Sequence, residues 1–198
     1  MNGINVMKID VTKRDGTKQE FDLEKVHKVL EWACKDITGV SISEIELKAN
    51  IQLYNNIPAY DIHELLIKSS AELISEHTPN YQFVAARLIN YKLRKEVYGR
   101  YEPKSLATMI SMNIDRDYEP WRLVELINEN IKRDVYDKEI LTSYTVEELE
   151  ELGRYIKHER DDTFTYTGME QFRGKYLVQD RKNKIHYETP QMLYMMVS

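Results

Sequence analysis

Five basic side chains in the first half of the chain have the types and spacing that could hold a phosphate group. Lys13 and Arg14 precede an Asp-Gly pair, Lys25 follows soon after, and Arg94 and Lys95 lie near the end of a long amphipathic segment. Charge-assisted hydrogen bonds from such groups to an anion contribute roughly 1.5–3 kcal/mol each. If folding brings these side chains together, they could bind a triphosphate.

Lys95 continues an apolar stripe of Val84, Leu88 and Tyr91. A lysine in such a stripe must reach solvent or meet a negative partner. The alternative is a solvated basic surface, because basic residues at helix ends favour the helix dipole and charged hairpin tips are common. The chain has no Walker-type glycine loop and no dinucleotide glycine fingerprint, so this pattern leaves both interpretations open.

A β-hairpin followed by a helix is predicted near the N-terminus. Alternating apolar residues over 7–11, the Asp15-Gly16 pair and an apolar return at Phe21 favour strand, tight turn and strand. Asp22 is predicted to cap the helix that follows. The apolar positions of that helix are Leu23, Val26, Leu30, Ala33 and Ile37.

Three further helices complete a predicted unit over residues 7–99. Ser43 and Asp61 each precede a glutamate by three residues, which predicts two capping boxes. Pro79 opens the fourth helix and Gly99 closes it. The positions predicted to be buried are Leu47, Ile51 and Tyr54 in the second helix and Ile62, Leu66, Ser69 and Leu73 in the third.

A boundary is predicted at residues 101–103, where Tyr-Glu-Pro interrupts the helical pattern. The elements predicted beyond it are a helix over 120–132 with Val124, Ile127 and Ile131 inward, a helix capped by Thr145 and Glu148, a hairpin over 176–187, and an apolar helix over 192–197 opened by Thr189-Pro190. Because a short apolar helix is marginal without tertiary packing, we expect the chain to continue in the full protein or to dock on a separate polypeptide.

The composition indicates a soluble globular chain, with 42% hydrophobic and 31% charged residues. The net charge of −5 argues against nucleic acid as a partner, and no apolar run reaches the roughly 20 residues of a membrane helix. Without a secretion signal, we expect a cytoplasmic protein with no membrane partner. Cys34, the single cysteine, is expected to be a small buried residue, and neither a metal site nor a catalytic residue is expected.

Several segments of the chain also resemble a known family. They are Val11–Gly16, Leu23–His27, Val29–Ala33, Asp61–Glu64, Tyr81–Leu88 and Tyr98–Pro103, followed by Lys157–Asp161, Phe164–Tyr166, Gly174–Val178 and Tyr187–Gln191. In order and spacing they are similar to the N-terminus of the class I ribonucleotide reductase large (alpha) subunit, which begins with an ATP-cone. Residues at about 107–135 look like an insertion.

The resemblance implies a mainly α fold with small β elements (α+β). It implies an ATP-cone at residues 7–99, made of four helices capped by a hairpin, and an incomplete N-terminal helical domain with a second hairpin at residues 100–198. The catalytic barrel would be absent. The implied function is that of an oxidoreductase making deoxyribonucleotides for DNA replication, with ATP or dATP as allosteric effector, with or without Mg²⁺. The implied partners are the rest of the large subunit and the radical-generating small subunit, in an oligomer.

Carried over by position, the resemblance also implies a nucleotide-binding set. Its members are Lys13, Arg14, Gln19, Glu20, Phe21, Asp22, Leu23, Glu24, Lys25, Ala59, Asp61, His63 and Lys95. The family favours a threonine where this chain has Ala59, which leads us to expect weak or absent inhibition by dATP. The family's catalytic cysteines would follow Ser198, so we expect this chain alone to be inactive.

Three other interpretations of the sequence compete with this one. A nucleotide-sensing repressor with a cone would carry a four-cysteine zinc ribbon, which a single cysteine excludes. An anaerobic-type reductase fits less well, because the similarity continues beyond Gly99. A helical interaction adaptor would need no nucleotide, so measurement of ATP binding separates it from a cone.

Overall fold

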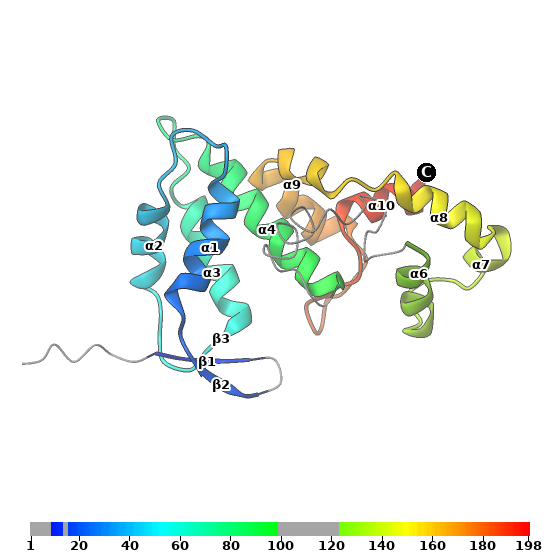
Figure 1. Cartoon of the computed structure of the whole chain (residues 1–198), viewed down its shortest axis with the longest axis horizontal. Coiled ribbons are helices and arrows are strands. Elements are labelled where there is room, and N and C mark those ends of the chain that lie inside the picture. The colour runs from blue at the N-terminus through cyan, green and yellow to red at the C-terminus, as the bar shows by residue number, and fades with distance from the viewer. Residues whose placement is uncertain (1–8, 14–15, 99–122) are drawn as a thin grey trace, which may run out of the picture. The chain divides into compact units, whose positions relative to one another are not determined.

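The computed structural model describes residues 9–13, 16–98 and 123–198, which form two compact units. The division falls between Leu88 and Ile89, within helix α4 (Tyr81–Tyr98). Figure 1 shows a mainly helical chain with small sheets, so the predicted fold class is confirmed. Among the helices that the structure describes, none is both long and apolar enough to cross a membrane.

A three-stranded sheet opens the first unit. Its strands are β1 (Asp10–Thr12), β2 (Lys18–Glu20) and β3 (Ile57–Pro58), in the order β2-β1-β3. The predicted hairpin is confirmed, since β1 and β2 are antiparallel and Gly16 adopts the positive φ of 81° that favours glycine at the turn. The parallel pairing of β3 with β1 was not predicted.

Helix α1 (Leu23–Cys34) begins where predicted, because the Asp22 carboxylate accepts hydrogen bonds from the backbone N–H groups of the first turn. Its buried residues are Val29, Leu30 and Ala33. Leu23, the first apolar position of this helix, is 48% exposed. The buried stripe lies in the C-terminal half of α1, which leaves the first residue of the helix uncovered.

Helix α2 (Ile42–Asn50) is capped by Ser41 instead of the predicted Ser43. Its buried residues are Ile45 and Ala49, while the predicted stripe is exposed, with Leu47 at 65%, Ile51 at 78% and Tyr54 at 53%. The predicted N-cap of this helix was therefore wrong by two residues. Two residues correspond to a rotation of about 200° around a helix, which turns the predicted face to solvent.

Helix α3 (Ala59–Ala71) begins at Ala59 after Pro58, so Asp61 lies in its first turn and is not its cap. Of the predicted face, Leu66 and Ser69 are buried and Ile62 and Leu73 are half-buried. Helix α4 (Tyr81–Tyr98) begins two residues after the predicted Pro79, and Gly99 lies outside the described residues.

Polar contacts tie the helices of the first unit together. The Tyr81 hydroxyl accepts a hydrogen bond from the Ser41 N–H at 2.9 Å and donates one to the Glu44 carboxylate. Between α1 and α2, His27 Nδ1 lies 2.7 Å from Glu46 Oε1. This hydrogen bond raises the pKa of His27 above its ordinary value.

The second unit contains the C-terminal half of α4 and a series of short elements. These are α6 (Leu123–Lys132), α7 (Ile140–Ser143), α8 (Val146–Arg154), η1 (His158–Thr163), α9 (Tyr166–Gln171), η2 (Phe172–Tyr176), β4 (Gln179–Asp180), β5 (Ile185–His186) and α10 (Pro190–Val197). The predicted boundary at 101–103 and most of the predicted insertion lie outside the described residues. The two-domain division therefore stays a prediction.

Several predicted elements of the second unit are confirmed. Thr145 and Glu148 form the predicted capping box, and α10 begins at Pro190 directly after Thr189. The predicted hairpin is present but shorter, as β4 paired with β5. The core contains Val97, Leu123, Ile127, Leu149, Ile156 and Met192, with Val124 and Ile131 partly buried against it.

Asp161 in η1 is a buried carboxylate. Its Oδ1 accepts a hydrogen bond from Gln191 of α10 at 2.9 Å, and its backbone carbonyl accepts one from Asn90 of α4 at 2.7 Å. Its Oδ2 is buried and has no hydrogen-bond partner among the described residues. Burial raises the pKa of Asp161 from 3.8 to about 6, because the charged form is poorly solvated there.

We predict that Asp161 makes the second unit less stable as pH rises from about 4 to about 6. A folded-state pKa above the unfolded value stabilises the fold at low pH, and this stability is lost as the pH passes the folded pKa. A gap of about two units corresponds to a loss of up to roughly 3 kcal/mol. Asp161→Asn should abolish this loss, as measured by urea unfolding at several pH values.

Asp180→Asn is the control, because Asp180 should change stability with pH in the opposite direction to Asp161. Hydrogen bonds from Asn183 and Lys182 lower the pKa of Asp180, so its contribution to stability is lost as pH falls. If the difference in unfolding free energy between Asp161→Asn and the original chain does not change with pH, Asp161 does not carry this linkage.

We also predict a pH dependence for the contact between α1 and α2. The pKa of His27 is raised in the folded state, so His27 stabilises the fold fully below its ordinary pKa. This stabilisation is lost as pH rises through the raised, folded-state pKa. Between about pH 6 and about pH 8, the Tm of the original chain should fall more than that of Glu46→Gln. Thermal unfolding of both chains measures this, with the exposed Glu76→Gln as control. Equal pH dependence in all three would contradict the prediction.

Candidate nucleotide-binding site

The sheet of the first unit brings Lys13 and Ala59 to the same edge. β1 and β3 are parallel, with Val11 opposite Ile57 and Thr12 opposite Pro58. The next residue of each chain segment is Lys13 after β1 and Ala59 after β3. Two residues that lie 46 positions apart in the sequence are thus neighbours because parallel strands end at a common edge.

Lys18, which the sequence analysis did not include, also lies at this edge. It is opposite Thr12 in the β1–β2 register, and its side chain is exposed. Directly opposite residues project from the same face of a sheet, so Lys18 and Thr12 share a face. Gln19, opposite Val11, lies on the other face, with the buried Ile57. The pairing register was the signal that could have identified Lys18.

The segment from Phe21 to Lys25 begins at the opposite edge of the sheet, because Phe21 lies opposite Ile9, four residues and about 13 Å of strand before Lys13. Phe21 is fixed there by its N–H, which donates to the Ile9 carbonyl at 2.8 Å. Asp22 is occupied by capping α1, and Lys25 Nζ lies 3.6 Å from its Oδ2. Lys25 is a surface cation, with 66% of its side chain exposed.

Acidic residues of the predicted set are less suited to phosphate. Glu20 and Glu24 are both exposed. A carboxylate beside a triphosphate is repelled, so these two side chains can contact a nucleotide only away from its phosphates or through a cation.

Asp61 and His63 lie in the first two turns of α3, half-buried. Tyr54 donates a hydrogen bond from its hydroxyl to Asp61 Oδ2 at 3.4 Å. Desolvation, with the neighbouring Asp61 carboxylate, raises the pKa of Tyr54. These groups can donate and accept hydrogen bonds near a sugar or base, whereas the Ala59 methyl group cannot.

Two members of the predicted set are not placed with the others. Arg14 lies outside the described residues. Lys95 lies on α4 beyond the division, in the second unit, where it is half-buried. The assignment of both residues to a nucleotide site stays a prediction.

Two helices begin at the edges of the sheet. Figure 1 shows α1 and α3 both running away from it, so the N-terminus of each helix is at the sheet. The N–H groups and the positive dipole end of a helix N-terminus favour an anion. Asp22 caps α1, whereas Pro58 supplies no side-chain hydrogen bond to α3. The edge with Lys13, Lys18 and the start of α3 is therefore the more favourable one for phosphate.

The arrangement is suited to binding rather than covalent chemistry. Cys34 on α1 is only partly exposed, and burial raises the pKa of its thiol to about 11. A thiol with so high a pKa is a poor nucleophile at neutral pH. Among the described residues, no group of three or more His, Cys, Asp or Glu side chains could hold a metal ion.

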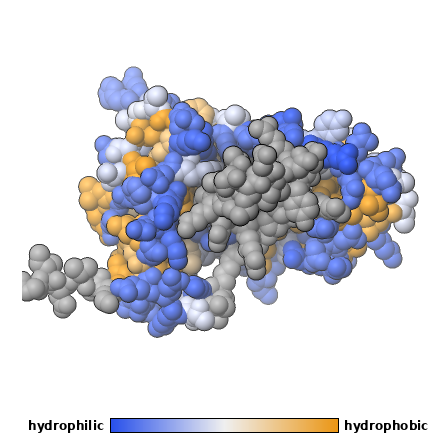
Figure 2. Space-filling model, viewed as in Figure 1, coloured by the Kyte–Doolittle hydropathy of each residue, from blue (hydrophilic) through white to orange (hydrophobic). Residues whose placement is uncertain are grey.

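The surface near the site combines polar and apolar regions. Figure 2 shows hydrophilic surface over the hairpin and apolar patches along the edge that α2 occupies. The exposed residues there include Leu47 and Ile51.

Comparisons with known proteins show the family to which the chain belongs. Residues 9–96 match the model of the ATP cone domain family. The chain is 42% identical over 188 residues to ribonucleoside-diphosphate reductase 1 subunit alpha of Escherichia coli (strain K12), and 41% identical over 188 residues to the alpha subunit of Buchnera aphidicola subsp. Acyrthosiphon pisum. It is 40% identical over 191 residues to the alpha subunit of Enterobacteria phage T4. These matches cover 95–96% of this chain but only 22–23% of each relative.

Proposed function

From an ATP-cone domain at residues 9–96 and homology of the chain to the N-terminal region of class I ribonucleotide reductase alpha subunits, we propose that this chain is the effector-binding part of such a subunit. Its first unit binds ATP or dATP. The observation that carries this proposal is the family match over the same residues that place Lys13 and the start of α3 at one edge of the sheet.

The proposed pose follows from the charges. The phosphates contact Lys13 and the N–H groups at the start of α3, with Lys18 and Lys25 adding positive potential. Asp61 and His63 lie further along α3, so they face the sugar or base. Lys95, Arg14 and a Mg²⁺ ion on the triphosphate belong to the proposal on sequence grounds alone.

The rest of the proposal concerns the whole protein. This chain spans only about a fifth of the length of its relatives. The complete subunit reduces ribonucleoside diphosphates to deoxyribonucleotides in the cytoplasm, together with a radical-generating small subunit. The cone regulates that activity. Radical reduction needs several cysteines, and this chain has only Cys34, so the chain alone is inactive.

A second candidate function is an interaction role without nucleotide. It is favoured by the exposed apolar stripe on and after α2, where Leu47, Ile51 and Tyr54 are each more than half exposed. Binding of ATP separates the two functions, because an adaptor has no need of a triphosphate.

We predict that Lys13→Ala weakens ATP binding by about 10–100-fold, which corresponds to the roughly 1.5–3 kcal/mol of one charge-assisted hydrogen bond. Isothermal titration calorimetry with the 198-residue chain measures the Kd. Lys35→Ala is the matched control, because Lys35 is exposed at the far end of α1 and should leave the Kd unchanged. Equal affinity in Lys13→Ala and the original chain would remove Lys13 from the site, and no ATP binding at all would favour the adaptor. Lys95→Ala tests the sequence-derived contact in the same way.

We further predict that dATP inhibits the complete enzyme weakly or not at all. Discrimination between ATP and dATP depends on hydrogen-bonding groups beside the nucleotide, and Ala59 supplies no hydroxyl. Ala59→Thr should restore inhibition, since allosteric coupling needs differential binding of about 1–3 kcal/mol and one hydrogen bond is of that size. Activity is assayed while dATP is titrated, with ATP-saturated controls. Strong inhibition of the original enzyme that is lost in Asp61→Ala or His63→Ala would contradict the prediction.

A further inference from the structure

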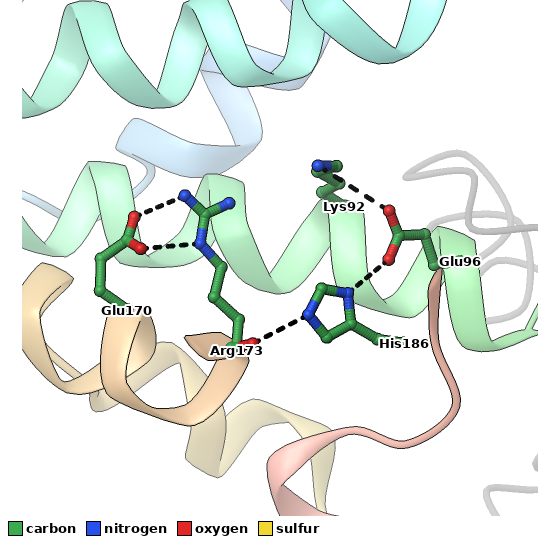
Figure 3. Close-up of polar contacts among 5 residues, drawn as sticks. All are labelled: Lys92, Glu96, Glu170, Arg173 and His186. Atoms are coloured by element: carbon green, nitrogen blue, oxygen red, sulfur yellow. Dashed lines mark hydrogen bonds and ion pairs between the residues drawn. The ribbon is translucent and has the colours of Figure 1, made fainter. Parts of the chain in front are cut away.

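In the second unit, His186 lies between two groups that can accept hydrogen bonds. Its Nδ1 is 2.8 Å from Glu96 Oε2 on α4, and its Nε2 is 3.0 Å from the backbone carbonyl oxygen of Arg173 in η2. Figure 3 shows the imidazole ring of β5 bridging these two elements. The side chains of His186 and Glu96 are only 11% and 4% exposed, so solvent has little access to the contact.

The two hydrogen-bond partners of His186 determine how many protons the contact must contain. A backbone carbonyl only accepts, so Nε2 must carry the hydrogen of that bond. A neutral imidazole has a single N–H, which would leave the lone pair of Nδ1 facing a carboxylate oxygen. Two acceptors at 2.8 Å repel each other, so a further proton must lie between Nδ1 and Glu96.

The neighbouring charges decide which partner holds that proton. Lys92 Nζ lies 3.8 Å from the other carboxylate oxygen of Glu96, which favours the ionised carboxylate. On the other side, the Arg173 guanidinium donates to the Glu170 carboxylate at 2.6 and 2.8 Å, so its positive charge is offset by that partner. Figure 3 shows this second pair beside the bridge. An ionised Glu96 leaves the proton on His186.

We propose that His186 is an imidazolium in the folded protein and acts as a proton-dependent clamp that joins β5 to α4 and η2. With both nitrogens protonated, the ring donates to Glu96 and to Arg173 at once. A neutral ring can keep only one of the two hydrogen bonds.

The clamp matters because the hairpin it holds is small. β4 and β5 contain two residues each, and only Gln179–His186 and Asp180–Ile185 are paired. Beyond the strands, the Tyr187 N–H donates to the Val178 carbonyl at 3.0 Å, and the Val178 N–H donates to Glu188 at 2.7 Å. Other contacts also hold this region, since the Gln179 side chain donates to the Arg173 carbonyl at 2.8 Å and Asn130 of α6 donates to the Tyr187 carbonyl at 3.1 Å. Loss of one proton from His186 therefore removes one of several contacts, the one through the His186 ring.

The protonation state is tested by NMR of the whole chain labelled with ¹⁵N-histidine at about pH 7. We expect both His186 nitrogens to be protonated. In Glu96→Gln, the amide can donate to Nδ1, so a neutral ring satisfies both partners and one nitrogen should become unprotonated. Glu129→Gln is the charge-matched control on α6 and should leave His186 doubly protonated. A neutral ring in the original chain, or an imidazolium in Glu96→Gln, would overturn the proposal.

The clamping role is tested separately by hydrogen exchange. His186→Gln can keep at most one of the two contacts, so the Tyr187 amide should exchange at least about tenfold faster. The Leu149 amide, which donates to the Thr145 carbonyl in α8, reports whether the unit remains folded and should not change. An unchanged rate at Tyr187 with an unchanged Leu149 would show that the ring holds nothing in place.

Discussion

The parallel pairing of β3 with β1 is the contact on which the candidate site depends. It joins backbone segments 46 residues apart, and α1 and α2 form the crossover that parallel strands require. Side chains reinforce the two-residue ladder: Asn55 accepts a hydrogen bond from the Asp10 N–H at 2.9 Å, and Thr12 donates to the Asn56 carbonyl at 3.3 Å. Without this pairing, the end of β1 and the start of α3 would share no edge.

In the first unit, the start of a helix could be predicted from the sequence when only one residue could serve as its N-cap. Asp22 had no competitor, and α1 begins where expected. In α2, Ser41 and Ser43 each precede a glutamate by three residues, so the sequence fits two helix starts equally well. The choice depends on Tyr81, which binds both Ser41 and Glu44 from a helix 37 or more residues away. A two-residue strand ending in proline, such as β3, likewise has no local signature.

The charged residues of the second unit show a different limit of sequence reasoning. Lys92 and Glu96 have the spacing of an ordinary surface pair on a helix, yet their side chains are only 7% and 4% exposed. Asp161 also reads as a surface residue and is fully buried. Burial of such groups is decided by the elements that pack over them, and α9 and η2 were not predicted. In the candidate site, Lys13 and Ala59 were proposed from the sequence, but their position at a common edge of the sheet was not predicted.

The environment of Cys34 has a practical consequence for spectroscopy. With a thiol pKa of about 11, only about one molecule in ten thousand carries the thiolate at neutral pH. Thiol-directed dyes attack the thiolate, so the native cysteine reacts slowly. A cysteine introduced at an exposed hairpin position such as Lys18 would keep the ordinary reactivity of a free thiol. The chain can thus carry a single fluorophore beside the sheet edge without removal of its own cysteine.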